Sequence, residues 1–148
     1  MTIDFAVADD GDAPRVRRAT AGGRSQQRAV LHTADPLPRV LERVNGKKAI
    51  LLDVREQSEW DAGHLRHAVL LPLSDLKKLK QNPDMQAKVK KLSKDKILYC
   101  HCKAGGRVLA ATPILRSLGY DIRPLKAGYG DLLKAGFEKA PPSDAKSK

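Results

Sequence analysis

The stretch KILYCHCKAGGRV, residues 96–108, decides the fold class. It begins as a short apolar strand, passes Cys102 and two glycines, and continues from Arg107 into a helical pattern of apolar residues. A strand end fixes the position of Cys102, while Gly105 and Gly106 allow the backbone to curl around its sulfur. The amides of the first helical turn can then point inward, so we expect this turn to stabilise a thiolate or an anion.

The segments on either side of this stretch alternate between strand and helix signals. Strands are predicted at residues 49–54, 68–71 and 120–125, in addition to 97–101. Helical patterns cover residues 36–45, 74–81, 83–92, 106–118 and 128–135. This order predicts an α/β fold with a central, mostly parallel sheet flanked by helices on both sides. Ligands bind beyond the carboxyl ends of such strands, where Cys102 and Asp53 both lie.

Several local signals refine these elements. Asp35 before Pro36 predicts a capped start for the first helix, and Ser74 predicts a cap for the second. Residues 55–67 are polar around Gly63 and are predicted to be irregular. Pro113 lacks a backbone N–H, so we expect a kink or an early break in the helix that contains it.

The composition favours one domain with anionic partners. The chain has 148 residues, 41% of them apolar, and its 28 Lys and Arg against 17 acids give a formal charge of +11. Only 4% of residues are aromatic, which argues against a nucleic-acid partner that stacks its bases. Eight Lys and three Asp lie between Asp75 and Lys96; we interpret them as a solvated face, with an acidic docking surface as the alternative.

The ends of the chain differ from its centre. Residues 1–30 show no sustained apolar period, so we expect a disordered extension there, and residues 139–148 predict a flexible tail. An arginine-rich targeting peptide is the alternative for the extension, but its four Asp argue against it. No apolar run approaches the roughly 18 residues that span a bilayer. We therefore expect no membrane partner. Cys100 and Cys102 are too close in sequence for a useful disulfide, so we expect reduced thiols and a cytoplasmic location.

Three motifs in order resemble those of rhodanese-domain sulfurtransferases. Cys102-Lys-Ala-Gly-Gly-Arg107 is similar to the family's C-x-x-G-x-R active-site loop. The stretch from Leu52 to Leu65, with Asp-Val-Arg, an acidic segment and Gly-His, resembles its first signature, and residues 119–136 resemble its closing signature. The resemblance covers roughly residues 35–138 and implies a rhodanese-like domain at 31–138. Three departures concern the wall of the site and the choice of acceptor: Val108 in place of Ser, Ala127 in place of the first of two paired glycines, and Leu132 in place of Trp.

The resemblance implies a single-domain, thiosulfate-type sulfurtransferase without a metal or organic cofactor. The catalytic cysteine, Cys102, would take sulfane sulfur from an anionic donor such as thiosulfate, hold it as a persulfide and pass it to cyanide or a thiol. The loop that binds the persulfide would comprise Lys103, Ala104, Gly105, Gly106 and Arg107. Asp53 and Arg55 would support the loop as an ion pair, and His64 would have a structural role.

Other interpretations of the same residues stay open. A non-catalytic rhodanese-like binding or regulatory module would use the fold without turnover. Related phosphatases have five residues between cysteine and arginine, whereas four separate Cys102 from Arg107, which favours sulfur over a tetrahedral oxyanion. Cys100 is expected to be a buried apolar residue on the same side as Cys102, with a redox partner as the alternative. One strand cannot easily direct Cys100, His101 and Cys102 at a single metal ion. The sequence does not define the oligomeric state.

Overall fold

The computed structural model describes residues 30–141, and the predictions for residues 1–29 and 142–148 lie outside that part. The described elements, in chain order, are α2 (Leu37–Asn45), β2 (Ala49–Asp53), α3 (Gln57–Ala62), β3 (Ala68–Leu70), α4 (Leu73–Lys77), η2 (Leu79–Gln81), α5 (Pro83–Lys90), β4 (Ile97–His101), α6 (Arg107–Arg116), β5 (Asp121–Pro124) and α7 (Tyr129–Lys134). All four predicted strands are present, within two residues of their predicted ends. The α/β class is therefore confirmed.

The four strands form one sheet in the order β3-β2-β4-β5, and every pairing is parallel. The register places Asp53, at the end of β2, beside His101, at the end of β4. Because parallel strands end at the same edge, the residue after β4, Cys102, emerges beside the carboxyl end of β2. The sequence prediction that Asp53 and Cys102 share this edge is confirmed.

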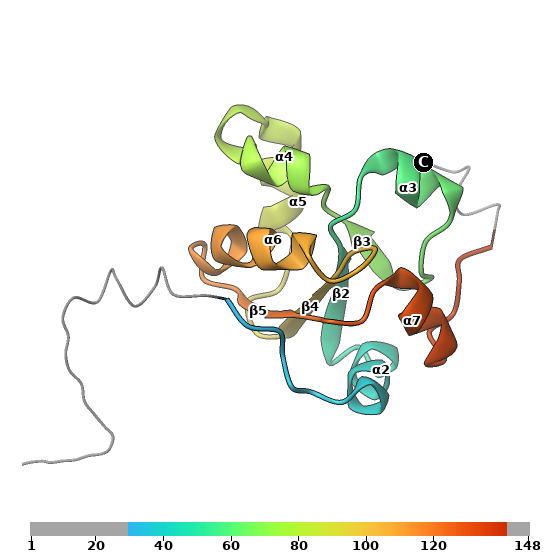
Figure 1. Cartoon of the computed structure of the whole chain (residues 1–148). Helices are drawn as coiled ribbons and strands as arrows, with labels where there is room; N and C mark the ends of the chain where they lie inside the picture. Colours follow the sequence, from blue (N-terminus) through green and yellow to red (C-terminus); the bar gives the residue numbers. More distant parts are fainter. Residues whose placement is uncertain (1–29, 142–148) are drawn as a thin grey trace, which may run out of the picture. The chain divides into compact units, whose positions relative to one another are not determined.

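Helices cover both faces of the sheet, as Figure 1 shows with α4, α5 and α6 on one side and α2 on the other. Successive strand residues point to opposite faces, so each strand contributes to both cores. Leu52, Leu98, Cys100 and Ile122 pack with residues of α4, α5 and α6. Ala49, Leu51 and Tyr99 pack with residues of α2 and α7. The central strands are buried on both sides, which explains their continuous apolar sequence.

Three local predictions were wrong. Residues 57–62, expected to be irregular, form α3, whose first turn is closed by the Glu56 N–H donating to the Glu59 carboxylate over 3.0 Å. Asp35 makes no cap to α2, because its carboxylate accepts from Tyr99, Arg43 and Arg123 instead. Ser74 lies inside α4, and its hydroxyl donates to the Glu56 carboxylate over 2.6 Å.

The helix α6 continues past Pro113 to Arg116, so the proline does not end it. At the carboxyl side, Lys139 forms an antiparallel bridge with Leu65, and the Ala140 N–H donates to the His64 carbonyl over 2.8 Å. The described fold thus includes Lys139 and Ala140, the first two residues of the predicted tail. Within residues 30–141, no helix has the length and apolar character that a membrane span requires.

Candidate active site

Cys102 follows the central strand β4 directly and lies almost fully buried at the start of the loop that leads into α6. The Gly105 N–H donates to the Cys102 sulfur over 3.1 Å. A backbone N–H aimed at sulfur stabilises negative charge on it, and the amino end of the ten-residue α6 begins two residues later. The local geometry therefore suits a sulfur that becomes anionic.

Two glycines allow the Cys102 loop to lie against the segment that follows β5. Gly105 has φ +91°, and a Cβ there would lie 2.5 Å from the Lys126 carbonyl oxygen. A Cβ on Gly128 would overlap the Lys103 carbonyl oxygen and lie 2.5 Å from its carbon. The Tyr129 N–H donates to the Cys102 carbonyl over 2.9 Å, which joins the two segments at this point. The shape of the loop thus depends on close backbone packing.

Arg107 is bound to a carboxylate that the sequence prediction did not include. Its two terminal nitrogens donate to the two Glu59 oxygens over 2.6 and 2.9 Å, a bidentate ion pair between α6 and α3. This hydrogen bond lowers the pKa of Glu59 to about 2, and the Glu59 contact raises the pKa of Arg107. The guanidinium, expected to face the sulfur, is thus held by Glu59, and its first role is to fix the loop to α3.

A buried ion pair supports the same edge of the sheet. Arg55 donates from Nε and one terminal nitrogen to the Asp53 carboxylate, with a shortest distance of 2.8 Å, and both side chains are buried. Arg55 also donates to the Gly63 carbonyl over 2.8 Å and lies 4.2 Å from the centre of the Tyr129 ring. The predicted pair of Asp53 and Arg55 is confirmed, and it links β2 to the residues that hold the Cys102 carbonyl.

His101 lies at the end of β4 beside this pair and is fully buried. Its Nε2 lies 3.8 Å from the Asp53 carboxylate and has no hydrogen-bond partner among the described residues. Burial lowers the pKa of His101, so the ring is neutral at neutral pH. A neutral imidazole beside Cys102 adds no positive charge that would attract an anion.

His64 belongs to the frame of the site. Its ring stacks on Trp60 with centroids 3.6 Å apart, and its Nδ1 lies 3.1 Å from the Trp60 carbonyl oxygen. Both side chains are buried, so they hold the end of α3 against the neighbouring loop. These contacts agree with the structural role expected for His64.

Both cysteines are buried, Cys100 within β4 and Cys102 directly after it. Cys100 is a free thiol buried in the core formed with α4, α5 and α6, and burial raises its pKa to about 12. Cys102 belongs to the same core cluster, which confirms that both side chains lie on one side of the sheet. A thiol with so high a pKa carries almost no thiolate at neutral pH, so Cys100 is a packing residue in this fold.

His32 also reaches the loop, a contact that the sequence prediction did not include. Its Nε2 lies 2.7 Å from the Gly105 carbonyl oxygen, and the neighbouring Thr33 N–H donates to the Pro124 carbonyl over 2.7 Å. Glu59 lies in the acidic segment of the first signature and His32 lies in no motif, but neither contact could be predicted, because the partners are 48 and 73 positions away. In the described part of the chain, no three His, Cys, Asp or Glu side chains are grouped to hold a metal ion.

Comparison with known proteins gives one consistent family. The human single-domain sulfurtransferase TSTD1 is 33% identical, with a TM-score of 0.57 over 66% of this chain and 92% of its own. The Helicobacter pylori 26695 protein hp1203 is 34% identical, with a TM-score of 0.52 over 73% of this chain and 92% of its own. Both solved structures are therefore similar to the chain in sequence and in fold.

Curated relatives match a shorter part. The Bacillus subtilis protein YqhL, described as uncharacterized, is 35% identical over 88 residues, which are 59% of this chain and 63% of that protein. The adenylyltransferase and sulfurtransferase UBA4 of Vanderwaltozyma polyspora is 30% identical over 88 residues, and the chain spans only 20% of its length. A family model for the rhodanese-like domain matches residues 37–135. The chain therefore belongs to the rhodanese-like domain family.

Proposed function

We propose that this chain is a sulfurtransferase that uses Cys102 to carry sulfane sulfur from an anionic donor such as thiosulfate to cyanide or a thiol. One observation carries the proposal: the Cys102 sulfur stands at the carboxyl end of the central strand and accepts the Gly105 N–H at the start of α6. The names of TSTD1 and UBA4 describe those proteins as sulfurtransferases, which supports the same chemistry here.

In the first half of the reaction, the Cys102 thiolate attacks the outer sulfur of thiosulfate. The new S–S bond forms as the old one breaks, and sulfite leaves with the electron pair of the broken bond. The persulfide that results carries negative charge on its outer sulfur, which needs hydrogen-bond donors. The amides of Lys103, Ala104, Gly105, Gly106 and Arg107 are the group that we assign to this task.

In the second half, cyanide or an acceptor thiolate attacks the outer sulfur of the persulfide. The S–S bond breaks, its electron pair returns to Cys102, and the thiolate is ready for another donor. Arg107 acts through Glu59 to keep the loop in place, while Lys103 is exposed and attracts an anionic donor. Asp53 and Arg55 act as positioning residues beneath the loop.

The direct test compares thiocyanate release from thiosulfate and cyanide by the native chain and by Cys102→Ser. The proposal expects release from the native chain and background release from the variant. Cys100→Ala is the matched control and should keep its release, because Cys100 is a buried packing residue. Equal release from the native chain and Cys102→Ser would refute the assignment.

A binding or regulatory module without turnover is the second candidate. The observation that favours it is the burial of Cys102, which exposes only 1% of its surface and limits direct access by a donor. Mass spectrometry after exposure to several sulfur donors separates the two candidates. A module would gain no sulfur on Cys102, whereas the sulfurtransferase would gain it from at least one donor.

A further inference from the structure

A hollow of about 560 Å³ lies at the end of the sheet opposite the Cys102 loop. It opens beside the starts of β2 and β4, where Ala49 and Lys96 line it, whereas Cys102 follows the carboxyl end of β4. Its volume is in the range of a binding pocket, which is roughly 300–1,000 Å³. The proposed sulfur chemistry makes no use of this second site.

The hollow combines an apolar floor with a basic rim. Ile50, Val69 and Leu92 belong to the floor. Its basic rim consists of Lys47, Lys91 and Lys96. His67 and Lys88 also line the hollow, and the Lys88 Nζ donates to the Leu70 carbonyl over 2.7 Å. The residues that line the hollow within the described range include no Asp or Glu. Such a surface favours an occupant that is both apolar and acidic.

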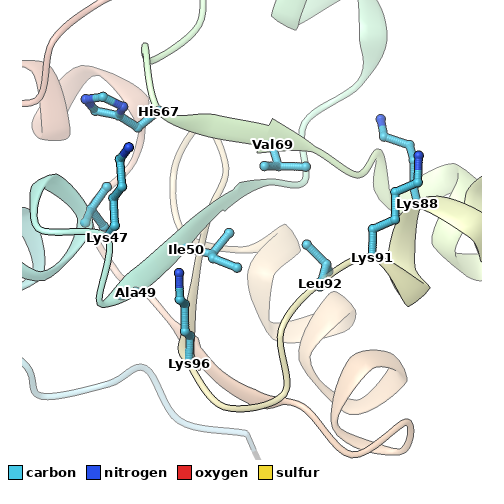
Figure 2. Close-up of a pocket in the computed structure, with 10 residues that line it drawn as sticks. Lys47, Ala49, Ile50, His67, Val69, Lys88, Lys91, Leu92 and Lys96 are labelled. Carbon is cyan, nitrogen blue, oxygen red and sulfur yellow. The ribbon is translucent and has the colours of Figure 1, made fainter.

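The rim lysines are spread out rather than gathered at one point. Figure 2 shows His67 and Lys47 on one side of the apolar floor, Lys88 and Lys91 on the opposite side, and Lys96 apart from both pairs. A compact anion would meet one of these groups and leave the others unused. An extended segment with several carboxylates can meet them together, while its apolar side chains cover the floor.

Other occupants fit the same observations less well. A second copy of this chain carries the same formal charge of +11, so repulsion opposes its approach to a basic surface. A single-stranded nucleic acid gains affinity by stacking its bases on aromatic side chains, and the rings that line the hollow are limited to His67 within the described residues. Phosphates also gain nothing from an apolar floor.

We propose that this hollow is a docking site for an acidic segment of a partner protein, with one or two apolar side chains on the floor and carboxylates on the lysine rim. Residues 75–96 supply two of the three rim lysines, Lys91 and Lys96, so the lysine-rich stretch is a binding surface and not only a solvated face. Because the hollow and Cys102 lie at opposite ends of the sheet, a docked partner leaves the sulfur site open.

The test measures fluorescence anisotropy of a labelled decapeptide that contains eight glutamates and two central leucines, at physiological salt. The double variant Lys91→Glu/Lys96→Glu should bind it at least about tenfold more weakly, because two attractive charges become repulsive. The control variant Lys77→Glu/Lys78→Glu makes the same change of charge on exposed residues outside the hollow. It should weaken binding by less than about threefold through long-range electrostatics alone.

Two further measurements change the probe and use the native protein, so they test the proposal even if a lysine variant fails to fold. Replacing both leucines with glutamine should abolish saturable binding, and an oligothymidine with the same number of charges should not compete at equal concentration. Cys102→Ser should bind the leucine peptide as the native chain does, which separates docking from sulfur transfer. Equal binding of both peptides, equal losses in both lysine variants, or stronger binding of the oligonucleotide would overturn the proposal.

Discussion

Replacing Gly128 with alanine tests whether the Cys102 loop depends on close packing against the segment after β5. Gly128 has φ −90°, a value that alanine also adopts, so the backbone angle itself causes no strain. The added Cβ would lie 2.5 Å from the Lys103 carbonyl carbon, whereas ordinary contacts begin near 3.4 Å. The Lys103 carbonyl would therefore have to retreat by at least about 0.9 Å to relieve the contact with its carbon, and by more to relieve the overlap with its oxygen.

That movement acts on Cys102 from both sides. It pulls on the Cys102 carbonyl, which accepts the Tyr129 N–H, and on the Gly105 N–H, which donates to the sulfur. Overpacking costs about 1–3 kcal/mol and a weakened hydrogen bond about 0.5–1.5 kcal/mol, so we expect a loss of roughly 2–4 kcal/mol in unfolding free energy. A displacement near 1 Å at a reacting group lowers rates by about 10- to 100-fold, which we expect for thiocyanate formation.

Urea denaturation and the thiocyanate assay measure the two effects. Gly130→Ala is the matched control, because a Cβ there meets nothing within 4 Å and the residue lies in α7. Alanine in a helix is favoured over glycine by about 0.5–1 kcal/mol, so the control should be equally or more stable and equally active. A Gly128→Ala protein with native stability and native activity would refute this account of the loop.

Three further predictions concern the ion pair and the second thiol. Glu59→Gln should reduce thiocyanate formation and lower stability, because Arg107 loses its bidentate carboxylate, whereas the exposed control Glu42→Gln should change neither in the same assays. The pKa of Glu59 is lowered from 4.5 to about 2, so the contribution of the ion pair to the unfolding free energy should be complete above pH 4.5 and disappear as the pH falls through 2. The unfolding free energies of the native and Glu59→Gln proteins, measured along an acid titration, should therefore converge near pH 2. Iodoacetamide at pH 8 should leave Cys100 unmodified until the chain unfolds, as peptide mass mapping would show, because its pKa is about 12; rapid labelling of Cys100 in the folded protein would contradict its packing role.

The main features of the fold could be predicted because they depend on short-range patterns. The apolar run at Ala49–Asp53 and the stretch at 96–108 each carry a whole strand signal, and their alternation with helices determines a parallel sheet. The ion pair of Asp53 and Arg55 could also be predicted, since the residues are two positions apart at a strand end. Such features need no knowledge of distant contacts.

Other features could not be predicted because they depend on long-range contacts. The start of α3 at Glu56 lacks the usual capping residue, and Glu59 meets Arg107 only after the chain has folded. Asp35 has a suitable position for a helix cap, but three distant partners compete for its carboxylate. The hollow on the far side of the sheet combines residues from several segments, so its lysines resembled an ordinary solvated face in the sequence.

The central claim is that Cys102 carries sulfur, and intact-protein mass spectrometry tests it most directly. The native chain, reduced and then exposed to thiosulfate, should gain the mass of one sulfur atom, located by peptide mapping on Cys102 and removed by cyanide. Cys102→Ser should gain nothing, while Cys100→Ala should gain the same single sulfur as the native chain. A native chain that stays at its original mass with every sulfane donor, or that gains sulfur on Cys100 instead, would contradict the claim.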